Sequence, residues 1–304
     1  MRRWLGECAF LGGLTAPSRT RRKDEHHLSA PAARRRGRHR RGDPRPRGHP
    51  RLIGHGGHVF QRQRPNVGAN SGLIGIGLSI EHLHPANVIV RNLHISGVTA
   101  ESGDGDAIHI QDADHIWIDH NTLSSDLDHG TDYYDGLLDA TRASDNITAS
   151  WNHLATHIKG SLLGHDDDNA AEDTGHLRVT YHHNWFDRTM ERNPRIRFGD
   201  PVHIYDNLYS NITGSDDYYG IASTQDAGAL VEDNVFENVV QACWSASGYA
   251  DSGPGRLVAR NNQLVNSGPC ETNGTVAAIP YAYTLEDVGT VKASVTAGAG
   301  AGHL

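Results

Sequence analysis

The chain has 304 residues, 37% of them hydrophobic, and a formal net charge of −8 at pH 7. This length is enough to bury one substantial core, and the 34 glycines suit many tight turns around a thin one. No run approaches the roughly 18 apolar residues of a membrane-spanning helix, so the sequence excludes a helical membrane span.

Residues 1–64 form a strongly basic front end. They hold 17 Lys and Arg against 4 Asp and Glu, a net charge of +13. The run Arg34–Arg41 continues into a Pro/Arg/Gly mixture that has too few apolar residues to fold alone. We therefore predict a disordered segment without a dedicated partner rather than a nucleic-acid-binding one. Arg2–Leu14 imitates a secretion signal only loosely, because Glu7 interrupts a very short apolar core, and no signal peptide is predicted.

Residues 65–304 are acidic and repeat one short unit. They hold 11 Lys and Arg against 32 Asp and Glu, a net charge of −21. The unit is a short run rich in Val, Ile and Thr, followed by Asn and then a large apolar residue, and the asparagine returns every 23 to 32 residues. It occurs at Val90–Leu93, Ile118–Asn121, Ala149–Asn152, Tyr181–Phe186, Ile204–Tyr209, Val231–Phe236 and Ala259–Asn262.

This period, without intervening helical patterns, predicts one all-β domain of stacked coils, a right-handed parallel β-helix. An antiparallel sandwich is disfavoured, because it would show turn signals at shorter spacing and would not explain the asparagine register. We expect each asparagine to adopt left-handed backbone and to hydrogen-bond through its amide to the copies above and below.

Acidic residues stand before or within two predicted strands. Asp104 and Asp106 precede the strand expected at 107–110, and Asp135 and Asp139 lie four apart in an apolar run. Partly buried carboxylates this close repel each other, and a hard cation between them relieves the repulsion. Oxygen-only ligands favour calcium. From sequence alone, Asp135 and Asp139 are equally compatible with solvated loop acids.

The few cations of the acidic body gather in one stretch, at Lys159, Arg188, Arg192, Arg195 and Arg197. Because the body is acidic overall, a general basic field cannot capture a polyanion. A bridging cation together with bidentate arginine contacts to carboxylates can do so. The pattern therefore predicts a site for an acidic polymer.

Other polar residues leave alternatives open. His120, His182 and His183 are compatible with a zinc site, although scaffold roles are favoured. Cys243 and Cys270 lie about one coil apart and could pair, which would leave Cys8 over. The remaining acids are interpreted as solvated loops, one of which could hold a second structural calcium: Asp126, Asp128, Asp132 and Asp166–Asp168.

These motifs resemble the pectate lyase family. Trp117–His120 matches its WIDH signature, Asp135–Asp139 its calcium pair, Lys159 its substrate lysine and Arg192–Arg197 its RxPxxR signature. The similarity runs from about Asn66 to the C-terminus. It implies a calcium-dependent polysaccharide lyase that cleaves α-1,4-linked polygalacturonate by β-elimination to 4,5-unsaturated oligogalacturonates. It also implies an extracellular enzyme, which we expect to act as a monomer.

The resemblance assigns roles to single residues. Arg192 stands where the family places its base, and Lys159 and Arg197 would neutralise and orient the uronate. Arg195 is either a further substrate contact or part of a structural salt bridge. Calcium would be bound by Asp106, Asp135 and Asp139, with Asp104 as an auxiliary ligand.

The sequence also departs from the family pattern. Many members have a lysine two residues after the second aspartate, where this chain has Thr141. The first coils are hard to find before Leu73, so the domain expected at 65–304 could lack some of them. Three other functions stay open: a pectin lyase, a polygalacturonase on the same fold, and a non-catalytic β-helix that binds cell-wall polysaccharide.

Overall fold

The computed structural model describes residues 58–61, 72–247 and 252–304, all of which lie in the unit Pro46–Leu304. Most of the basic segment predicted to be disordered therefore lies outside the described residues. Strand β1 (His58–Gln61) lies on the N-terminal side of the domain boundary expected at residue 65, and the position of that boundary stays a prediction.

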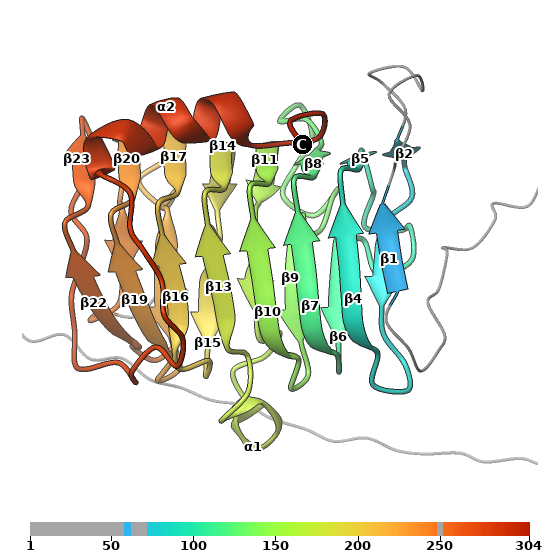
Figure 1. The fold of residues 1–304 in the computed structure, drawn as a ribbon, viewed down its shortest axis with the longest axis horizontal. Coiled ribbons are helices and arrows are strands. Elements are labelled where there is room, and N and C mark those ends of the chain that lie inside the picture. Colours follow the sequence, from blue (N-terminus) through green and yellow to red (C-terminus); the bar gives the residue numbers. More distant parts are fainter. Residues whose placement is uncertain (1–57, 62–71, 248–251) are drawn as a thin grey trace, which may run out of the picture. The chain divides into compact units, whose positions relative to one another are not determined.

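Three sheets surround the core of the described unit (Figure 1). Within each sheet, a strand is hydrogen-bonded to the strand that comes three strands later in the chain, such as β1 to β4. Sheet A contains β3 (Leu78–Ile80), β6 (Ile108–Gln111), β9 (Leu138–Thr141), β12 (Leu162–Leu163), β15 (Arg195–Arg197), β18 (Ile221–Thr224) and β21 (Cys243–Trp244). Sheet B contains β1, β4 (Ala86–Arg91), β7 (Asp114–Asp119), β10 (Asp145–Ser150), β13 (Val179–His182), β16 (Val202–Tyr205), β19 (Gly228–Glu232) and β22 (Arg256–Arg260).

Sheet C contains β2 (Leu73–Ile74), β5 (His94–Ser96), β8 (Thr122–Ser124), β11 (His153–Lys159), β14 (Trp185–Glu191), β17 (Leu208–Ile212), β20 (Val235–Val239) and β23 (Gln263–Val265). The strands of each sheet pair in parallel, as β4 does with β7, β5 with β8 and β6 with β9. Each coil of the chain thus supplies one strand to every sheet, which confirms the predicted parallel β-helix.

The core consists of columns of apolar side chains at equivalent positions of successive coils. In sheet C, Phe186, Tyr209 and Phe236 share one register position and are fully buried. Their rings stack at centroid distances of 4.9 and 4.5 Å. This geometry explains the β-branched and aromatic bias of the repeat, because each side chain packs mainly on its own counterpart one coil away.

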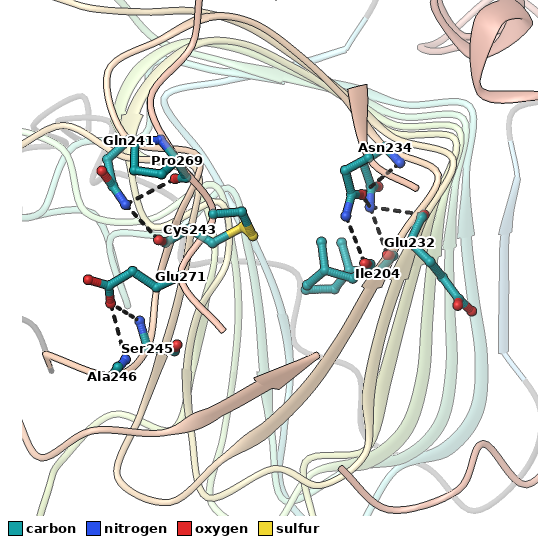
Figure 2. The surroundings of a disulfide bond; sticks show 12 residues. Ile204, Glu232, Asn234, Gln241, Cys243, Ser245, Ala246, Pro269 and Glu271 are labelled. Atoms are coloured by element: carbon teal, nitrogen blue, oxygen red, sulfur yellow. Dashed lines mark hydrogen bonds between the residues drawn. A yellow bond between two sulfur atoms is a disulfide. The ribbon is translucent and has the colours of Figure 1, made fainter. Parts of the chain in front are cut away.

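A column of buried asparagines ties the coils together between sheets B and C. Its members are Asn121, Asn152, Asn184, Asn207, Asn234 and Asn262. The Oδ1 atom of Asn184 accepts hydrogen bonds from the backbone and side-chain amides of Asn152, both at 3.0 Å. Its Nδ2 donates to the carbonyl of Ala149 at 2.8 Å and to Asn207 Oδ1 at 3.0 Å. Figure 2 shows the equivalent bonds of Asn234 to the carbonyls of Ile204 and Glu232. The expected bonding between copies is confirmed.

Two details of that expectation are wrong. Left-handed backbone belongs to the residue before each ladder asparagine, for example His120 (φ 50°), Trp151 (φ 53°) and Asp206 (φ 53°), rather than to the asparagine itself. Asn92 is not a ladder member, because its coil places Leu93 opposite Asn121 and the Leu93 N–H donates to Asn121 Oδ1 at 3.0 Å. In each turn, the residue with left-handed backbone therefore comes directly before the ladder asparagine.

Cys243 and Cys270 form a disulfide between the last strand of sheet A and the following coil. The bond encloses a sequence separation of 27 residues, for which a stabilisation of about 2–4 kcal/mol is typical. Near it, Glu271 accepts the backbone N–H groups of Ser245 and Ala246 at 2.9 and 3.1 Å (Figure 2). The pairing left open by the sequence is present.

The C-terminal segment runs back over the coils as a strap. Helix α2 (Val288–Gly298) lies along the ends of β14, β17 and β20 (Figure 1) and buries Val291 and Val295 against Leu208 and Val235. The Gly300 N–H then donates to the carbonyl of Trp151 at 2.8 Å. The other helix, α1 (Ala170–Asp173), is a single short turn. Within the described residues, neither helix is long and apolar enough to cross a bilayer.

We predict that Asn184→Ala lowers the free energy of unfolding by on the order of 3 kcal/mol, because it leaves buried amide and carbonyl groups of two neighbouring coils without partners. Urea denaturation followed by circular dichroism measures this change. Asn262→Ala is the matched control. Asn262 accepts the same two bonds from Asn234, at 3.0 Å each, but is only half-buried, so water can replace the lost amide. Equal losses in the two variants would contradict a stabilising role for the buried ladder.

Candidate active site

The predicted site residues come from neighbouring coils and lie at or near the turns that connect strands of sheet C to strands of sheet A. Asp106 and Asp135 stand in the turns that lead into β6 and β9, and Asp139 lies within β9. Lys159 ends β11, and Arg192 lies in the turn between β14 and β15. Because β6, β9, β12 and β15 are successive strands of sheet A, carboxylates and cations line adjoining coils.

Asp106 is buried and both of its carboxylate oxygens are engaged. Oδ1 accepts the Gly136 N–H at 2.7 Å, and Oδ2 lies 2.7 Å from His109 Nδ1. Burial raises the pKa of Asp106 above its usual value, opposed by His109 and reinforced by Asp135. Burial alone would lower the pKa of His109, but its bond to Asp106 and the nearby carboxylates outweigh this and raise that pKa to about 9. His109 is thus a cation that partly neutralises the acidic cluster.

Asp139 is the most deeply placed of the three acids. Its Oδ1 accepts the Leu162 N–H at 2.9 Å. Burial, and then the charge of Asp106, raise its pKa well above the usual value, while Arg192 acts in the opposite direction. A Cβ at position 136 would lie only 2.5 Å from Asp139 Oδ1, so a larger residue at that position would displace the buried Asp139 carboxylate. Asp139 is buried, whereas Asp135 is half-buried and its carboxylate is 45% exposed.

Asp135 is held from two sides. Its carbonyl accepts a hydrogen bond from Nε2 of the buried His157 at 2.7 Å, which fixes the tautomer of that ring. Its Oδ1 lies 3.4 Å from Lys159 Nζ. Asp104 is exposed at the rim, where it accepts a hydrogen bond from the Ser79 hydroxyl.

The donor set fits a hard cation in its chemistry. All its ligand atoms would be oxygens, and burial, followed by the charges of Asp106 and Asp135, raises the pKa of Asp139, an effect that a bound cation would oppose. In residues 72–247 and 252–304, however, no three His, Cys, Asp or Glu side chains stand at metal-ligand spacing. A bound cation would therefore have to compete with Lys159 for Asp135 and with His109 for Asp106.

The cationic half of the site consists of three guanidiniums and one ammonium. Arg192 has left-handed backbone (φ 59°), and its buried Nε has no hydrogen-bond partner among the described residues. A buried donor without a partner is costly, and a functional role is one explanation for it. Burial, followed by the charges of Arg197 and Arg192, lowers the pKa of Arg195.

Arg197 and Arg195 share an anchor that the sequence did not reveal. Arg197 donates from Nε to Asp167 and from Nη1 to the Gly164 carbonyl at 2.7 Å. Arg195 donates to the Ser252 hydroxyl, which in turn donates to Asp167 at 2.6 Å. The interpretation of Asp166–Asp168 as solvated acids is therefore wrong for Asp167. Nothing local distinguishes Asp167 from its neighbours, because its partner lies 30 residues away.

The three histidines that were compatible with zinc lie at the end of sheet B instead. Trp151 stacks between His120 and His183, with centroid distances of 5.7 and 4.3 Å. His182 stacks on Tyr205 at 5.2 Å. Each ring thus has an aromatic neighbour from the next coil, as a scaffold role requires.

Comparison with known proteins gives consistent matches. A family model described as pectate lyase matches residues 60–304. Pectate lyase A of Aspergillus niger is 40% identical over 233 residues, which cover 76% of this chain and 67% of that protein. Pectate lyase A of Emericella nidulans is 41% identical over 235 residues, covering 77% and 67%. The solved pectate lyase of Bacillus sp. N165, in complex with trigalacturonate, superimposes with a TM-score of 0.67 at 31% identity, covering 76% of this chain and 72% of that one.

The half-buried His182 predicts how stability depends on pH. Burial, and then the charge of His183, lower the pKa of His182 from 6.5 to about 4. Between these values the unfolded state binds more protons, so His182 makes stability fall as the pH falls from about 6.5 to about 4. We predict that His182→Phe, which keeps a ring against Tyr205, reduces this loss by on the order of 1–2 kcal/mol. Urea denaturation at several pH values measures it. Equal profiles for wild type and His182→Phe would contradict the assignment.

Proposed function

The chain belongs to the pectate lyase family of polysaccharide lyases, and on that premise we propose that it cleaves α-1,4-linked polygalacturonate by calcium-dependent β-elimination. The products would be 4,5-unsaturated oligogalacturonates. One observation carries the proposal furthest. The buried, unpartnered Nε of Arg192 belongs to a guanidinium that acts electrostatically on Asp139, so a candidate base adjoins a candidate cation site.

The carboxylates of Asp106, Asp135 and Asp139 would hold the calcium ion, with Asp104 at the rim. When bound, the ion would neutralise these carboxylates together with that of the substrate and so favour charge build-up next to C5. The chain's part is to gather the acids, to bury Asp106 and Asp139, and to leave Asp135 accessible from outside. Release of Asp135 from Lys159 would then free that ammonium for the substrate.

Arg192 would accept the C5 proton. The electron pair of the C–H bond then forms the C4–C5 double bond, and the glycosidic oxygen at C4 departs and takes up a proton. Guanidinium groups are normally protonated in proteins, so this role requires high pH and neighbouring positive charge. Arg195 and Arg197 of the adjoining strand β15 supply positive charge. We therefore expect an alkaline optimum.

Lys159 and Arg197 would orient the uronate through its carboxylate. Both side chains are about 10% exposed. The anchor on Asp167 holds the Arg197 guanidinium in one orientation, which lowers the entropy cost of binding. Arg195, which donates to Ser252 and is nearly buried, fits a structural role better than a substrate contact.

The disulfide supports export to an oxidising compartment, and we propose an extracellular location on this ground and on family membership. We expect a monomer. The alternatives are less well supported. A pectin lyase would not need the acidic cluster, a polygalacturonase would add water, and a binding module would not need an orphaned arginine. The ultraviolet absorbance of the unsaturated product separates elimination from hydrolysis and from binding.

We predict that a calcium chelator abolishes product formation from polygalacturonate, and that Asp139→Asn raises the calcium concentration for half-maximal activity at least on the order of tenfold. Asp173→Asn is the matched control. Asp173 is equally buried and accepts a backbone N–H from Ala143 at 2.8 Å, but it lies outside the site. Full activity of Asp139→Asn in the presence of chelator would refute the calcium mechanism, and full rescue by magnesium would mean that the metal has been misidentified.

We also predict that Arg192→Lys lowers kcat on the order of 100-fold with little change in KM, because it moves the basic nitrogen but keeps the charge. Arg197→Lys should chiefly raise KM, since it weakens ground-state and transition-state binding together. Steady-state kinetics at several alkaline pH values test the pair. The control is Arg188→Lys, at an exposed arginine paired with Asp187 at 3.4 Å. Near wild-type kcat for Arg192→Lys would exclude it as the base and leave Lys159 as the next candidate.

A further inference from the structure

A loop next to the proposed site carries an aromatic surface that the reaction itself does not use. Residues 125–134 connect β8 to the turn before β9. Asp132 of this loop lies 3.2 Å from Lys159 Nζ. The Ser125 hydroxyl donates to His157 Nδ1, and the same ring holds the carbonyl of Asp135. The loop is therefore fixed directly to Lys159 and, through His157, to Asp135.

Tyr133 and His129 form a flat stacked pair on this loop. Their ring centroids are 3.9 Å apart at an interplanar angle of 12°. Tyr134 meets Tyr133 edge-on at 4.8 Å, which supports the pair from the side. Tyr133 is nevertheless 47% exposed, and the His129 side chain is 41% exposed. An aromatic face thus remains open to solvent one residue from the contact with Lys159.

The surface is pre-organised rather than loose. The Ala100 N–H donates to the Tyr133 carbonyl at 2.9 Å, and the Tyr133 N–H donates to the Gly130 carbonyl at 3.1 Å. Asp126 accepts from the Tyr134 hydroxyl at 2.6 Å and from His129 Nδ1 at 2.7 Å. These bonds, first that from Tyr134 and then that from His129, lower the pKa of Asp126 to about 2. A fixed ring loses little entropy when a ligand stacks on it.

The charge around this surface is negative. Residues 125–134 contain three aspartates, Asp126, Asp128 and Asp132, and no lysine or arginine. The Asp132 side chain is 95% exposed. The cations that face them are Lys159 and, when protonated, His129. A galacturonate ring on Tyr133 would bring its own carboxylate towards these acids, whereas a methyl-esterified ring is neutral there.

On the basis of the proposed function, we propose that Tyr133 and His129 form a substrate subsite that stacks on a galacturonosyl ring adjacent to the one held by Lys159, and that this subsite prefers a methyl-esterified ring. The C–H bonds at C3, C4 and C5 of a galacturonosyl ring project from one face and suit the negative face of an aromatic ring. The enzyme would then favour partly esterified chains, in which a free carboxylate at Lys159 is followed by an ester on Tyr133.

The test compares kcat/KM on fully de-esterified polygalacturonate and on partly methyl-esterified pectin of matched length. Tyr133→Ala should lower kcat/KM on the partly esterified substrate on the order of five- to tenfold, mainly through KM, and should affect the de-esterified one less. Tyr133→Phe keeps the ring and should behave as wild type. Asp132→Asn should raise kcat/KM on the de-esterified substrate severalfold and so reduce the preference.

Tyr281→Ala is the matched control, because Tyr281 is 42% exposed but contacts sheet B through Thr180 and His203. Thermal unfolding verifies that each variant is folded. Unchanged kinetics of Tyr133→Ala on both substrates, or equal losses on both, would overturn the proposal. If wild type released no unsaturated product, the proposed function would fail instead. Calorimetric titration of wild type and Tyr133→Ala with the partly esterified oligomers would still test the proposed subsite. The proposal requires that the variant binds them more weakly than wild type does.

Discussion

The rest of the structure depends on the stacking of coils in register. The asparagine column provides the most specific part of this constraint. The amide of Asn184, for example, satisfies a backbone N–H and a carbonyl of the preceding coil and donates to the asparagine of the following one. The aromatic column Phe186, Tyr209 and Phe236 adds apolar packing along the same direction. Buried amides that pair only with their counterparts penalise any slip between coils, since a slip would leave them unpaired. The coils between the columns can therefore vary in length without loss of register.

Register is also what assembles the site. Asp106 and Arg192 are far apart in the chain, yet both lie where sheet C hands over to sheet A, on nearby coils. The stacked scaffold forces carboxylates and guanidiniums into proximity that neither group would adopt alone. The cost is visible in the raised pKa of Asp139 and the lowered pKa of Arg195, both caused chiefly by burial and then by like charges. Groups held at such a cost are typical of functional sites.

An acidic body that acts on an acidic polymer needs local rather than global attraction. The net charge of residues 65–304 is −21, so only the arginine cluster, Lys159 and a bound cation would draw the substrate in. The loop 125–134 then extends the site with an aromatic face and further negative charge. Recognition would thus depend on which sugar rings of the polysaccharide carry a free carboxylate, as well as on its total charge.

The sequence by itself determined the class of fold. The asparagine period predicted a parallel β-helix, and the resemblance of the motifs to pectate lyases implied the site residues, whose roles stay a prediction. Only the tertiary structure decided the partners. It placed Leu93 rather than Asn92 in the ladder, moved the left-handed bend to the preceding residue, and paired Arg197 with Asp167. The physical reason is that coil length varies between 23 and 32 residues, so contacts between coils depend on the length of every turn. A local pattern reports which residues bend or are buried, whereas the identity of the residue one coil away is set by the whole stack.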